Sequence, residues 1–184
     1  MKPYKRIFDI LFSIVILIIT APIILLISLG IILSDSGPVI FCSERIGCDG
    51  KVFTIYKFKS LKQKLSNINQ KLVTDKNDYR MFWFGKILRR THMDELPQFI
   101  NVLIGDMSVV GPRPLPKLYR EEKLKILPGI TGLAQVRIEN DKIHKCTYKL
   151  GFKYDRFYEK KYSIILDLYI ILKTTRNVFL AKGI

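Results

Sequence analysis

An almost continuous apolar run from Ile7 to Leu33 constrains the fold of this chain more than any other feature of its sequence. The run is longer than the roughly 20 residues that an α-helix needs to cross the hydrocarbon core of a bilayer. It is also too long for the core of a signal peptide, and no small-residue cleavage site follows it, so we expect it to be retained. An ordinary transmembrane helix is the first interpretation of such a run.

Two features favour a different interpretation, in which the segment enters and leaves the membrane on the same side. Pro22 stands in the middle of the run, where proline removes a helical hydrogen bond and kinks or breaks a helix. Cationic residues flank both ends, so the positive-inside rule places both ends in the cytoplasm. These residues are Lys2, Lys5 and Arg6 before the run and Arg45, Lys51, Lys57, Lys59, Lys62 and Lys64 after it. We therefore predict a re-entrant helix–break–helix.

Polar residues within the run are expected to meet local needs. Because irregular backbone is costly in lipid, the break at Pro22 must be short and covered by neighbouring groups. We expect the Thr20 hydroxyl to bond the carbonyls that Pro22 leaves free. Asp9 is within reach of Lys5 or Arg6 along a helix, which predicts an ion pair at the membrane interface.

The charge of the chain is strongly positive although the chain is also apolar. Lysine and arginine total 31 against 16 aspartates and glutamates, a net charge of +15, while 48% of the residues are hydrophobic. This combination indicates a membrane surface or an anionic substrate. Nucleic acid is the competing partner, but the chain has neither a Cys/His finger nor an RRM signature. Cys42, Cys48 and Cys146 lack the spacing of metal ligands and are expected to be reduced thiols in a cytoplasmic chain.

A short β-hairpin is predicted after the apolar run, once Ser36-Gly37-Pro38 has ended the helix. Val39–Phe41 and Val52–Tyr56 have the composition of strands, and Asp49-Gly50 favours the turn between them. The hairpin ends in the basic cluster Lys57-Phe58-Lys59, which is either a solvated face or an anion-binding group.

Four other segments have patterns that allow coarser predictions. Residues 61–80 are expected to form a surface helix followed by a loop. The aromatic segment 81–88 is either core or an anchor at the membrane interface. Residues 114–127 are expected to contain an exposed basic helix. Residues 148–184 predict amphipathic helices, which either lie in the membrane interface or pack on the core.

The stretch from Thr91 to Met107 is the one most typical of a functional site. Its apolar residues recur at helical spacing and predict one buried face, made of Leu96, Phe99, Ile100, Leu103 and Met107. Pro97 is tolerated only in a first helical turn. The adjacent carboxylates of Asp94 and Glu95 are therefore expected at or near the start of a helix.

Two interpretations of this carboxylate pair are open. In the first, Asp94 closes a capping box with Thr91, and Glu95 complements the helix dipole. In the second, the pair binds a divalent metal or attacks a phosphate. Mg²⁺ prefers hard oxygen ligands, typically one or two carboxylates together with substrate phosphates. Both interpretations can hold together, because the start of a helix also favours a bound anion.

Several ordered motifs, taken together, resemble one family. They are the Lys-Arg start with its proline-containing apolar run, ERIGxDGxxFxIYKFKS from Glu44, LRRTxxDELPQFxNVLxGDMSxVGPRP from Leu88, and PGITGLAQV from Pro128. The resemblance covers roughly Tyr4 to Leu180 and is to the bacterial sugar transferases, in biochemical terms the monotopic polyprenyl-phosphate phosphoglycosyl transferases. The chain resembles their minimal catalytic core, without the further N-terminal membrane helices of larger members.

The resemblance implies a reaction. Members of this family transfer a sugar-1-phosphate from a UDP-sugar to undecaprenyl phosphate and release UMP, which starts the synthesis of a surface glycoconjugate. The family's Asp-Glu pair falls on Asp94 and Glu95, so Asp94 is expected to form an aspartyl-phosphosugar intermediate while Mg²⁺ bridges the pair and the diphosphate. The membrane break falls on Ala21-Pro22. Departures from the family pattern at Leu127 and residues 137–139, beside Asn140, which fits the pattern, concern donor-sugar recognition rather than the reaction class.

Cations around the pair have a physical reason to be there. A carboxylate is ionised at pH 7 and needs no general base, so the difficulty is to bring anions together. That requires neutralising charge in the transition state. Two arginines offer bidentate forks to phosphate, and flanking prolines stiffen the loop of the second. The expected substrate-binding residues are Arg89, Arg113, Lys59, Pro112, Pro114 and Gln135.

The sequence thus predicts an α+β fold that is mainly helical, with a small β-hairpin and interfacial amphipathic helices around a cytoplasmic active site. Residues 1–35 are the re-entrant membrane hairpin, and residues 36–184 are the catalytic domain, at the cytoplasmic face of the bacterial inner membrane. The expected partners are a UDP-sugar, undecaprenyl phosphate and membrane phospholipids, with no nucleic acid. The alternative, a non-catalytic basic protein on membrane surfaces, explains the charge and the apolarity but neither DELPQ nor GPRP.

Overall fold

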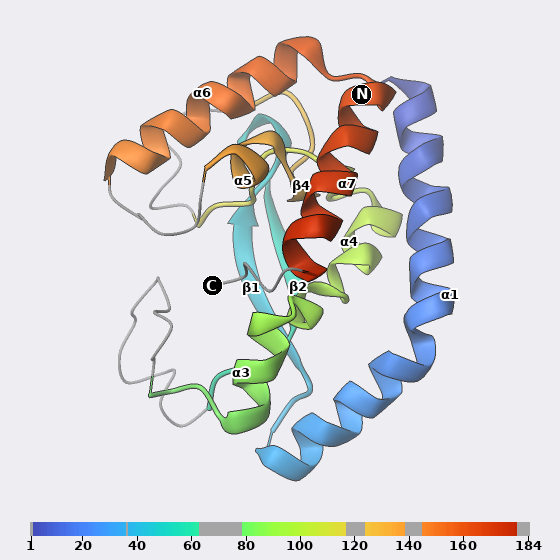
Figure 1. Ribbon diagram of the computed structural model, residues 1–184, viewed down its shortest axis with the longest axis vertical. Coiled ribbons are helices and arrows are strands. Elements are labelled where there is room, and N and C mark those ends of the chain that lie inside the picture. The colour runs from blue at the N-terminus through green and yellow to red at the C-terminus, as the bar shows by residue number, and fades with distance from the viewer. Residues whose placement is uncertain (1, 36, 63–78, 117–123, 139–144, 180–184) are drawn as a thin grey trace.

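Helices dominate the structure and surround two small sheets (Figure 1). The computed structural model describes residues 2–35, 37–62, 79–116, 124–138 and 145–179. The helices are α1 (Pro3–Ser34), α3 (Trp83–Arg90), α4 (Gln98–Ile104), α5 (Leu133–Arg137), α6 (Lys145–Lys161) and α7 (Ile164–Phe179), with short 3-10 turns η1 (Cys48–Gly50) and η2 (Met93–Glu95). The strands are β1 (Ile40–Ile46), β2 (Val52–Phe58), β3 (Ser108–Val110) and β4 (Gly129–Thr131). The predicted class, mainly helical α+β, is confirmed.

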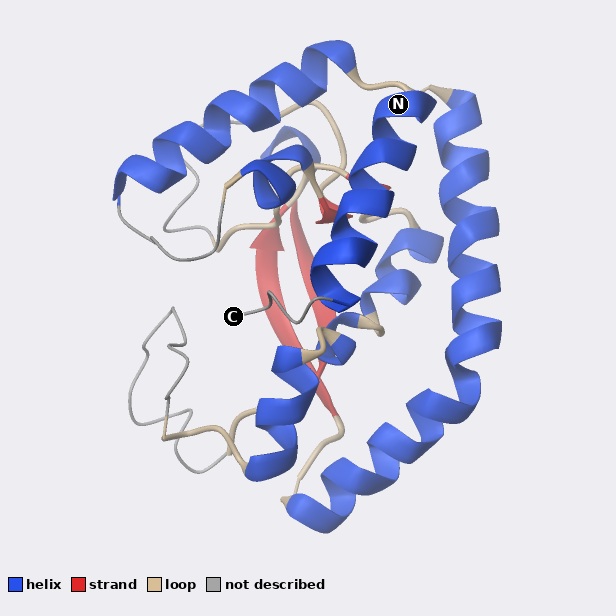
Figure 2. Cartoon of the chain, in the orientation of Figure 1, coloured by secondary structure: helices blue, strands red, loops and turns tan. Residues whose placement is uncertain are grey.

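The strands form an antiparallel pair and a parallel pair, drawn in red in Figure 2. The antiparallel pair is the predicted hairpin, and its strands run further than expected, from Ile40 paired with Phe58 to Ile46 paired with Val52. Asp49 and Gly50 both have positive φ, 53° and 80°, as the predicted turn requires. The parallel pair joins β3 to β4, and sequence reasoning predicted neither of these short strands.

The apolar run forms one bent helix rather than two helices joined by a break. The backbone stays helical through Ala21 and Pro22, so the expected interruption is wrong. A proline inside a helix removes one N–H and crowds the carbonyl four residues earlier, which bends the helix without ending it. Figure 1 shows α1 changing direction along its length. The Thr20 hydroxyl donates to the Ile16 carbonyl at 2.7 Å, not to the Ile18 carbonyl that Pro22 leaves free.

Polar residues in the first turns of α1 are buried against the rest of the protein, not placed at an interface. Asp9 is fully buried and accepts hydrogen bonds from the Ser108 hydroxyl at 2.7 Å and the Val109 amide at 3.1 Å, both in β3. The Lys5 ammonium pairs with Asp167 of α7 at 2.8 Å. The predicted interfacial ion pair of Asp9 is therefore wrong, because each partner is held by a residue far away in sequence.

Arg6 attaches the same end of α1 to α4. Its guanidinium donates to the carbonyls of Val102 and Leu103, at 2.6 Å and 2.9 Å. These carbonyls lie in the last turn of α4, where backbone acceptors are unsatisfied and a cation is favourable. Gly105 ends α4 with a φ of 107°, a conformation that favours glycine.

The far end of α1 attaches to the same body. Asp35, just after the helix, pairs with Lys59 at the end of β2, with 2.7 Å between Nζ and Oδ2. Ile27 and Ile31 are buried in a cluster with Phe58, Phe82 and Leu88. Both ends of α1 therefore contact the same body, while its outward face remains apolar and exposed, at Ile7, Leu11, Ile14, Val15, Ile18, Ile19, Leu25, Leu26, Leu29, Ile32 and Leu33.

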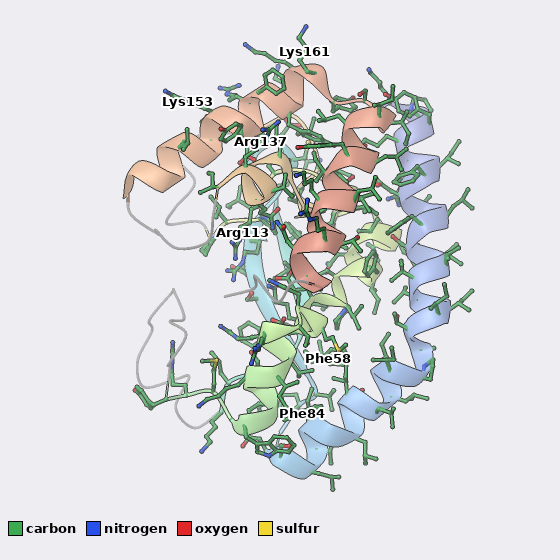
Figure 3. All side chains as sticks on the ribbon, in the orientation of Figure 1. Phe58, Phe84, Arg113, Arg137, Lys153 and Lys161 are labelled. Carbon is green, nitrogen blue, oxygen red and sulfur yellow. The ribbon has the colours of Figure 1, made fainter. Side chains whose placement is uncertain are left out.

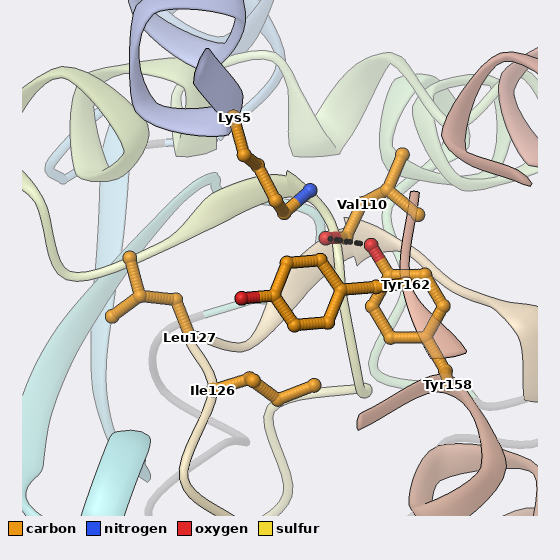
Figure 4. A pocket seen from close by; sticks show the side chains of 6 residues that line it. All are labelled: Lys5, Val110, Ile126, Leu127, Tyr158 and Tyr162. Carbon is orange, nitrogen blue, oxygen red and sulfur yellow. Dashed lines mark hydrogen bonds between the residues drawn. The ribbon is translucent and has the colours of Figure 1, made fainter. Parts of the chain in front are cut away.

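The main core lies between the hairpin, α4, β3, α6 and α7. It contains Phe53, Ile55, Val102, Met107, Val109, Val110, Leu133, Tyr158 and Ile170. The Tyr158 hydroxyl bonds both Asp167 and the Val110 carbonyl, the second at 3.1 Å, beside Lys5 (Figure 4). Burial, followed by the nearby Asp167 carboxylate, raises the pKa of Tyr158 well above its usual value. This tyrosine therefore stays a neutral hydrogen-bond donor at any ordinary pH.

The C-terminal helices each have a buried side that packs on the core, as one of the two predicted alternatives requires, and an exposed side. In α7, Asp167 and Ile170 are buried in the body, whereas Ile165 and Leu172 are exposed. The segment 81–88 divides in the same way, since Phe82 and Leu88 are core residues and Trp83 is 66% exposed. The parts of the predicted elements that fall in residues 63–78, 117–123 and 139–144 lie outside the described residues.

The buried pair between Lys5 and Asp167 generates a stability prediction. Lys5→Met leaves the Asp167 carboxylate buried without its cation, which costs on the order of 3–5 kcal/mol. We expect a large fall in Tm in detergent, and the double variant Lys5→Met/Asp167→Asn should recover part of it because no buried charge is then unpaired. Lys2→Met, the same change at an exposed lysine, is the control. The single variant Asp167→Asn is measured as well. If the fall in Tm of the double variant equals the sum of the falls of the two single variants, the coupling between Lys5 and Asp167 is disproved.

Candidate active site

The carboxylate pair lies in η2, between the end of α3 and the start of α4. Thr91 follows α3, and its hydroxyl donates to the carbonyls of Ile87 and Leu88 at 2.9 Å and 3.2 Å. The predicted capping box with Asp94 is therefore wrong, because Thr91 is used by the preceding helix. His92 has a φ of 56°, and this left-handed residue turns the chain out of α3 into η2.

Helix α4 fixes η2 against the hairpin through polar contacts that the sequence analysis missed. Asn101 is fully buried; its amide donates to the Thr54 carbonyl at 2.7 Å, and its oxygen accepts from the Tyr56 amide at 3.0 Å. These bonds take the place of a neighbouring strand beside β2. The predicted apolar face is correct for Met107 but wrong for Ile100, which is exposed, since α4 directs its polar Asn101 side toward the sheet.

Glu95 forms an ion pair with Lys57, with 2.6 Å between Nζ and Oε1. Burial opposes ionisation of Glu95, but the Lys57 ammonium and then Arg113 outweigh it and lower the pKa of this carboxyl. Glu95 is therefore a carboxylate at any pH near neutrality. Lys57 belonged to a basic cluster in the sequence analysis, but only the structure shows that it reaches the pair.

Asp94 is 7% exposed, and its environment differs from that of Glu95. Burial and, next, the adjacent Glu95 charge raise its pKa from 3.8 to about 6, while Lys57, Arg89 and His92 act in the opposite direction. Within the described part of the chain, no group donates a hydrogen bond to the Asp94 carboxylate. Asp94 is thus mainly ionised at pH 7, with oxygen lone pairs that are not engaged by the protein.

Arg89 is held beside the pair by a close approach of two segments. A Cβ on Gly85 would lie 2.2 Å from the Ser60 carbonyl oxygen, so only glycine lets α3 pack against the residue that follows the hairpin. One turn later, Arg89 Nε donates to the Ser60 hydroxyl at 2.8 Å. The positive charge of Arg89 lowers the Asp94 pKa, so Arg89 lies close enough to Asp94 to stabilise its ionised form.

Arg113 approaches the pair from the other side, in the segment after β3. The Pro112 carbonyl accepts from the Gly129 amide at 2.8 Å, and the Gly111 amide donates to the Thr131 carbonyl at 2.8 Å, so β4 fixes the chain up to Pro112. Arg113 is exposed, and Figure 3 shows it beside the hairpin strands. Its charge helps to lower the pKa of Glu95, which places its guanidinium near this carboxylate.

Two expected substrate-binding residues have their described contacts away from the carboxylate pair. Lys59 is buried and paired with Asp35, so it anchors α1. Gln135 lies in α5, where its amide donates to the Ile130 carbonyl at 3.4 Å, and no described contact links it to the carboxylate pair. Sequence could not separate Lys57 from Lys59, because their roles depend on β2 ending at Phe58.

The pair fits a divalent metal only in partnership with other ligands. In the parts of the chain that the structure describes, no group of three or more His, Cys, Asp or Glu side chains gathers. Asp94 and Glu95 supply two hard carboxylates, which is the protein contribution typical of Mg²⁺ sites completed by substrate phosphates and water. The residues present therefore fit Mg²⁺ bound together with a phosphorylated substrate.

Two carboxylates with a lysine and two arginines around them have the composition of a site suited to phosphate chemistry, on a body that carries a long apolar helix. Comparison with known proteins agrees with this class. The model of the bacterial sugar transferase family matches residues 1–181, and the chain belongs to that family.

Curated relatives match over nearly the whole chain. It is 42% identical over 193 residues to the UDP-glucose:undecaprenyl-phosphate glucose-1-phosphate transferase of Klebsiella pneumoniae, with 98% of this chain and 41% of that protein covered. It is 36% identical over 200 residues to the undecaprenyl-phosphate galactose phosphotransferase of Salmonella typhimurium, with 97% and 41% covered. It is 37% identical over 186 residues to the exopolysaccharide production protein PSS of Rhizobium leguminosarum, with 92% of each covered.

These matches differ in two informative ways. The chain spans less than half the length of the Klebsiella and Salmonella proteins but nearly all of the Rhizobium protein. The names of the first two carry different sugars, glucose and galactose, at similar levels of identity. Family membership therefore does not fix the sugar.

The raised pKa of Asp94 predicts that this residue destabilises the folded protein at neutral pH. A carboxyl group with a higher pKa in the folded state favours folding below its unfolded value, and stability falls as pH rises from about 4 to about 6. We expect Asp94→Asn to raise Tm at pH 7 in metal-free buffer, by removing a penalty of up to about 3 kcal/mol. The difference should vanish below pH 4.

The control for this prediction is Asp106→Asn, the same chemical change at a partly exposed carboxylate just after α4. It should leave Tm nearly unchanged at both pH values. A lower Tm for Asp94→Asn at pH 7 would show that the Asp94 charge stabilises the fold, contrary to the prediction.

Proposed function

We propose that the protein transfers a sugar-1-phosphate from a UDP-sugar to undecaprenyl phosphate and releases UMP. The observation that carries this proposal is the ionised but unpaired Asp94 carboxylate beside the Glu95–Lys57 ion pair, within the electrostatic reach of Arg89. Family membership supports the same reaction class, and the names of two relatives contain undecaprenyl phosphate as the acceptor. Transfer to this lipid would begin the assembly of a surface glycoconjugate.

In the first step, an Asp94 oxygen attacks the phosphorus atom that carries the sugar. A bond forms between that oxygen and phosphorus, and the bond to the UMP oxygen breaks, with UMP taking the electron pair. No proton transfer is needed, because the nucleophile is already ionised and UMP leaves as an anion. Arg89 and Lys57 lower the cost of bringing a carboxylate to a diphosphate.

In the second step, the phosphate of undecaprenyl phosphate attacks the same phosphorus atom. The bond to Asp94 breaks, the carboxylate is regenerated, and a lipid diphosphate sugar is formed. Because acceptor and nucleophile are both anions, no general base is required here either. Glu95 stays ionised throughout, since Lys57 holds it as a carboxylate.

We further propose that Mg²⁺ is the cofactor and that Asp94 and Glu95 hold it together with the diphosphate. When bound, the metal neutralises negative charge on the phosphates and polarises the phosphorus centre. Lys57 then keeps Glu95 in place, because its ion pair uses Oε1 and leaves the second carboxylate oxygen for other contacts.

The proposed location is the cytoplasmic face of the bacterial inner membrane, with both ends of α1 on that face. By length and composition, α1 is the one helix among the described residues that can cross a membrane. Its first turns are bonded to Asp167 and β3, however, and its end is paired with Lys59. A helix attached at both ends to one body cannot place those ends on opposite sides of a bilayer. We therefore favour insertion of the exposed apolar side of α1 from one face.

The reaction predicts UMP release from a UDP-sugar panel in the presence of undecaprenyl phosphate and Mg²⁺. In Asp94→Asn, release should fall by at least about 10³-fold, because the amide is a poor nucleophile. The covalent step is tested by exchange of labelled UMP into the UDP-sugar without any lipid acceptor. Wild type should catalyse this exchange, and Asp94→Asn should not.

The controls separate the reaction from the intermediate. Asp106→Asn should keep both activities. Release that requires the lipid, together with no exchange in its absence, would disprove the covalent intermediate and retain the transfer. Folded wild-type protein that releases no UMP from any sugar in a broad panel would contradict the proposed function.

Membrane attachment through the apolar surface predicts that wild type floats with neutral vesicles in 1 M salt, where electrostatic attraction is largely screened. Ile18→Glu/Leu25→Glu, on the exposed side of α1, should shift the protein to the soluble fraction by at least about tenfold, since burying these side chains is worth roughly 1.5–3 kcal/mol each. Leu150→Glu on α6 is the control. Release of wild type by salt alone would indicate purely electrostatic binding.

A further inference from the structure

Arg45 lies on the same face of the hairpin as Lys57. Antiparallel partners share a face, and Arg45 is paired with Phe53 while Phe41 is paired with Lys57. Since side chains alternate along a strand, Phe53, Ile55 and Lys57 point to one side. Phe53 and Ile55 are buried there, and Lys57 meets Glu95. Arg45 therefore extends the charged side of the hairpin away from the carboxylate pair.

A backbone contact brings Arg45 next to the segment that carries Arg113. The Ile46 amide donates to the Leu115 carbonyl at 3.2 Å, which joins the end of β1 to the chain two residues beyond Arg113. The two guanidinium groups influence each other, because burial and then the Arg113 charge lower the pKa of Arg45. Guanidinium groups are permanent cations in proteins, so two positive charges lie near each other at the edge of the site.

Neither guanidinium forms an ion pair with a carboxylate within the described part of the chain, although the Arg113 charge acts on Glu95. Arg45 donates only to the carbonyl of its neighbour Glu44, at 3.1 Å. Two like charges close together repel each other, and partial burial of one of them increases the cost. An anion bound between the two guanidinium groups offsets both their mutual repulsion and the cost of burying the Arg45 charge. Phosphate can accept hydrogen bonds from two arginines with good geometry.

We propose that Arg45 and Arg113 together bind the nucleotide-side phosphate of the UDP-sugar, the phosphate that leaves in UMP. This inference rests on the proposed function and adds a substrate-binding residue to it. The Arg113 charge acts on both Glu95 and Arg45, whereas Arg45 is not among the groups that chiefly shift the pKa of either carboxylate. The order from the nucleophile outward is then Asp94, Arg113 and Arg45. The sugar-bearing phosphate must contact Asp94, so the second phosphate lies outward from it.

This arrangement suits the departing group. When the bond between the sugar-bearing phosphorus and the bridging oxygen breaks, the electron pair stays on that oxygen, and the UMP phosphate gains one negative charge. Two preorganised guanidinium groups stabilise this charge as it develops. Figure 3 shows Arg113 on the opposite side of the hairpin strands from α1, which is the side expected to be open to a water-soluble nucleotide. The acceptor lipid phosphate is less suited to this position.

The test compares Arg45→Gln with wild type in UMP binding, measured by calorimetry on the detergent-solubilised protein with Mg²⁺. We expect the Kd for UMP to rise at least about tenfold, the effect of losing one charge-assisted contact. Uridine has no phosphate, so its Kd, measured by competition with UMP, should be the same in Arg45→Gln and in wild type. Lys51→Gln, an exposed cation on the same hairpin, is the control and should bind UMP as wild type does.

Kinetics distinguish the two phosphate sources. In Arg45→Gln, KM for the UDP-sugar should rise, KM for undecaprenyl phosphate should stay unchanged, and Tm should match wild type; Arg45→Lys should recover only part of the loss because it lacks the fork. A rise confined to the lipid KM would assign Arg45 to the acceptor and overturn the inference. Unchanged UMP affinity, or no UMP binding by wild type, would also overturn it. Absence of turnover contradicts the proposed function independently of the binding result.

Discussion

The attachment of a membrane-type helix to a soluble body through buried charge is the interaction on which the rest of the structure depends. Lys5, Arg6 and Asp9 occupy the first turns of α1, and they bond α7, α4 and β3 respectively. Each contact satisfies a group that would be very costly to bury alone. Because α4 follows the carboxylate pair and β3 precedes Arg113, the same contacts hold both sides of the candidate active site. The apolar helix is thus part of the scaffold of the candidate site as well as the proposed membrane anchor.

The two adjacent carboxylates of the candidate site have different surroundings, which shift their pKa values in opposite directions. Glu95 is compensated by Lys57 and remains an anion, whereas Asp94 is buried, has no hydrogen-bond partner among the described residues and has a pKa of about 6. The protein therefore keeps the Asp94 carboxylate, the proposed nucleophile, mainly ionised but poorly stabilised, next to cations that suit phosphate. Such a group is stabilised by substrate rather than by the fold, which is the usual compromise between stability and activity at functional sites.

Sequence alone predicted the class of the fold, the hairpin, the carboxylate pair and the two arginines, because these depend on local patterns and ordered motifs. It failed where long-range contacts decide. Thr91 has the spacing of an N-cap to Asp94 but ends the preceding helix, and Pro22 bends α1 without interrupting it. Asn101 replaces a strand beside β2, and nothing in its neighbours indicates that use. Lys57 and Lys59 differ in role only because β2 ends between them.

The contact between Lys5 and Asp167 joins residues that are 162 positions apart. A ribosome releases the apolar helix long before α7 exists, so the charges in the first turns of α1 have no partners during most of translation. Until Asp167 emerges, water and lipid head groups are the available solvent for Lys5, which favours an early position for this end of the helix at the bilayer surface. If α1 inserts in the membrane as proposed, the rest of the body assembles beside a helix that is already there, and docking of α7 supplies the partner that buries Lys5.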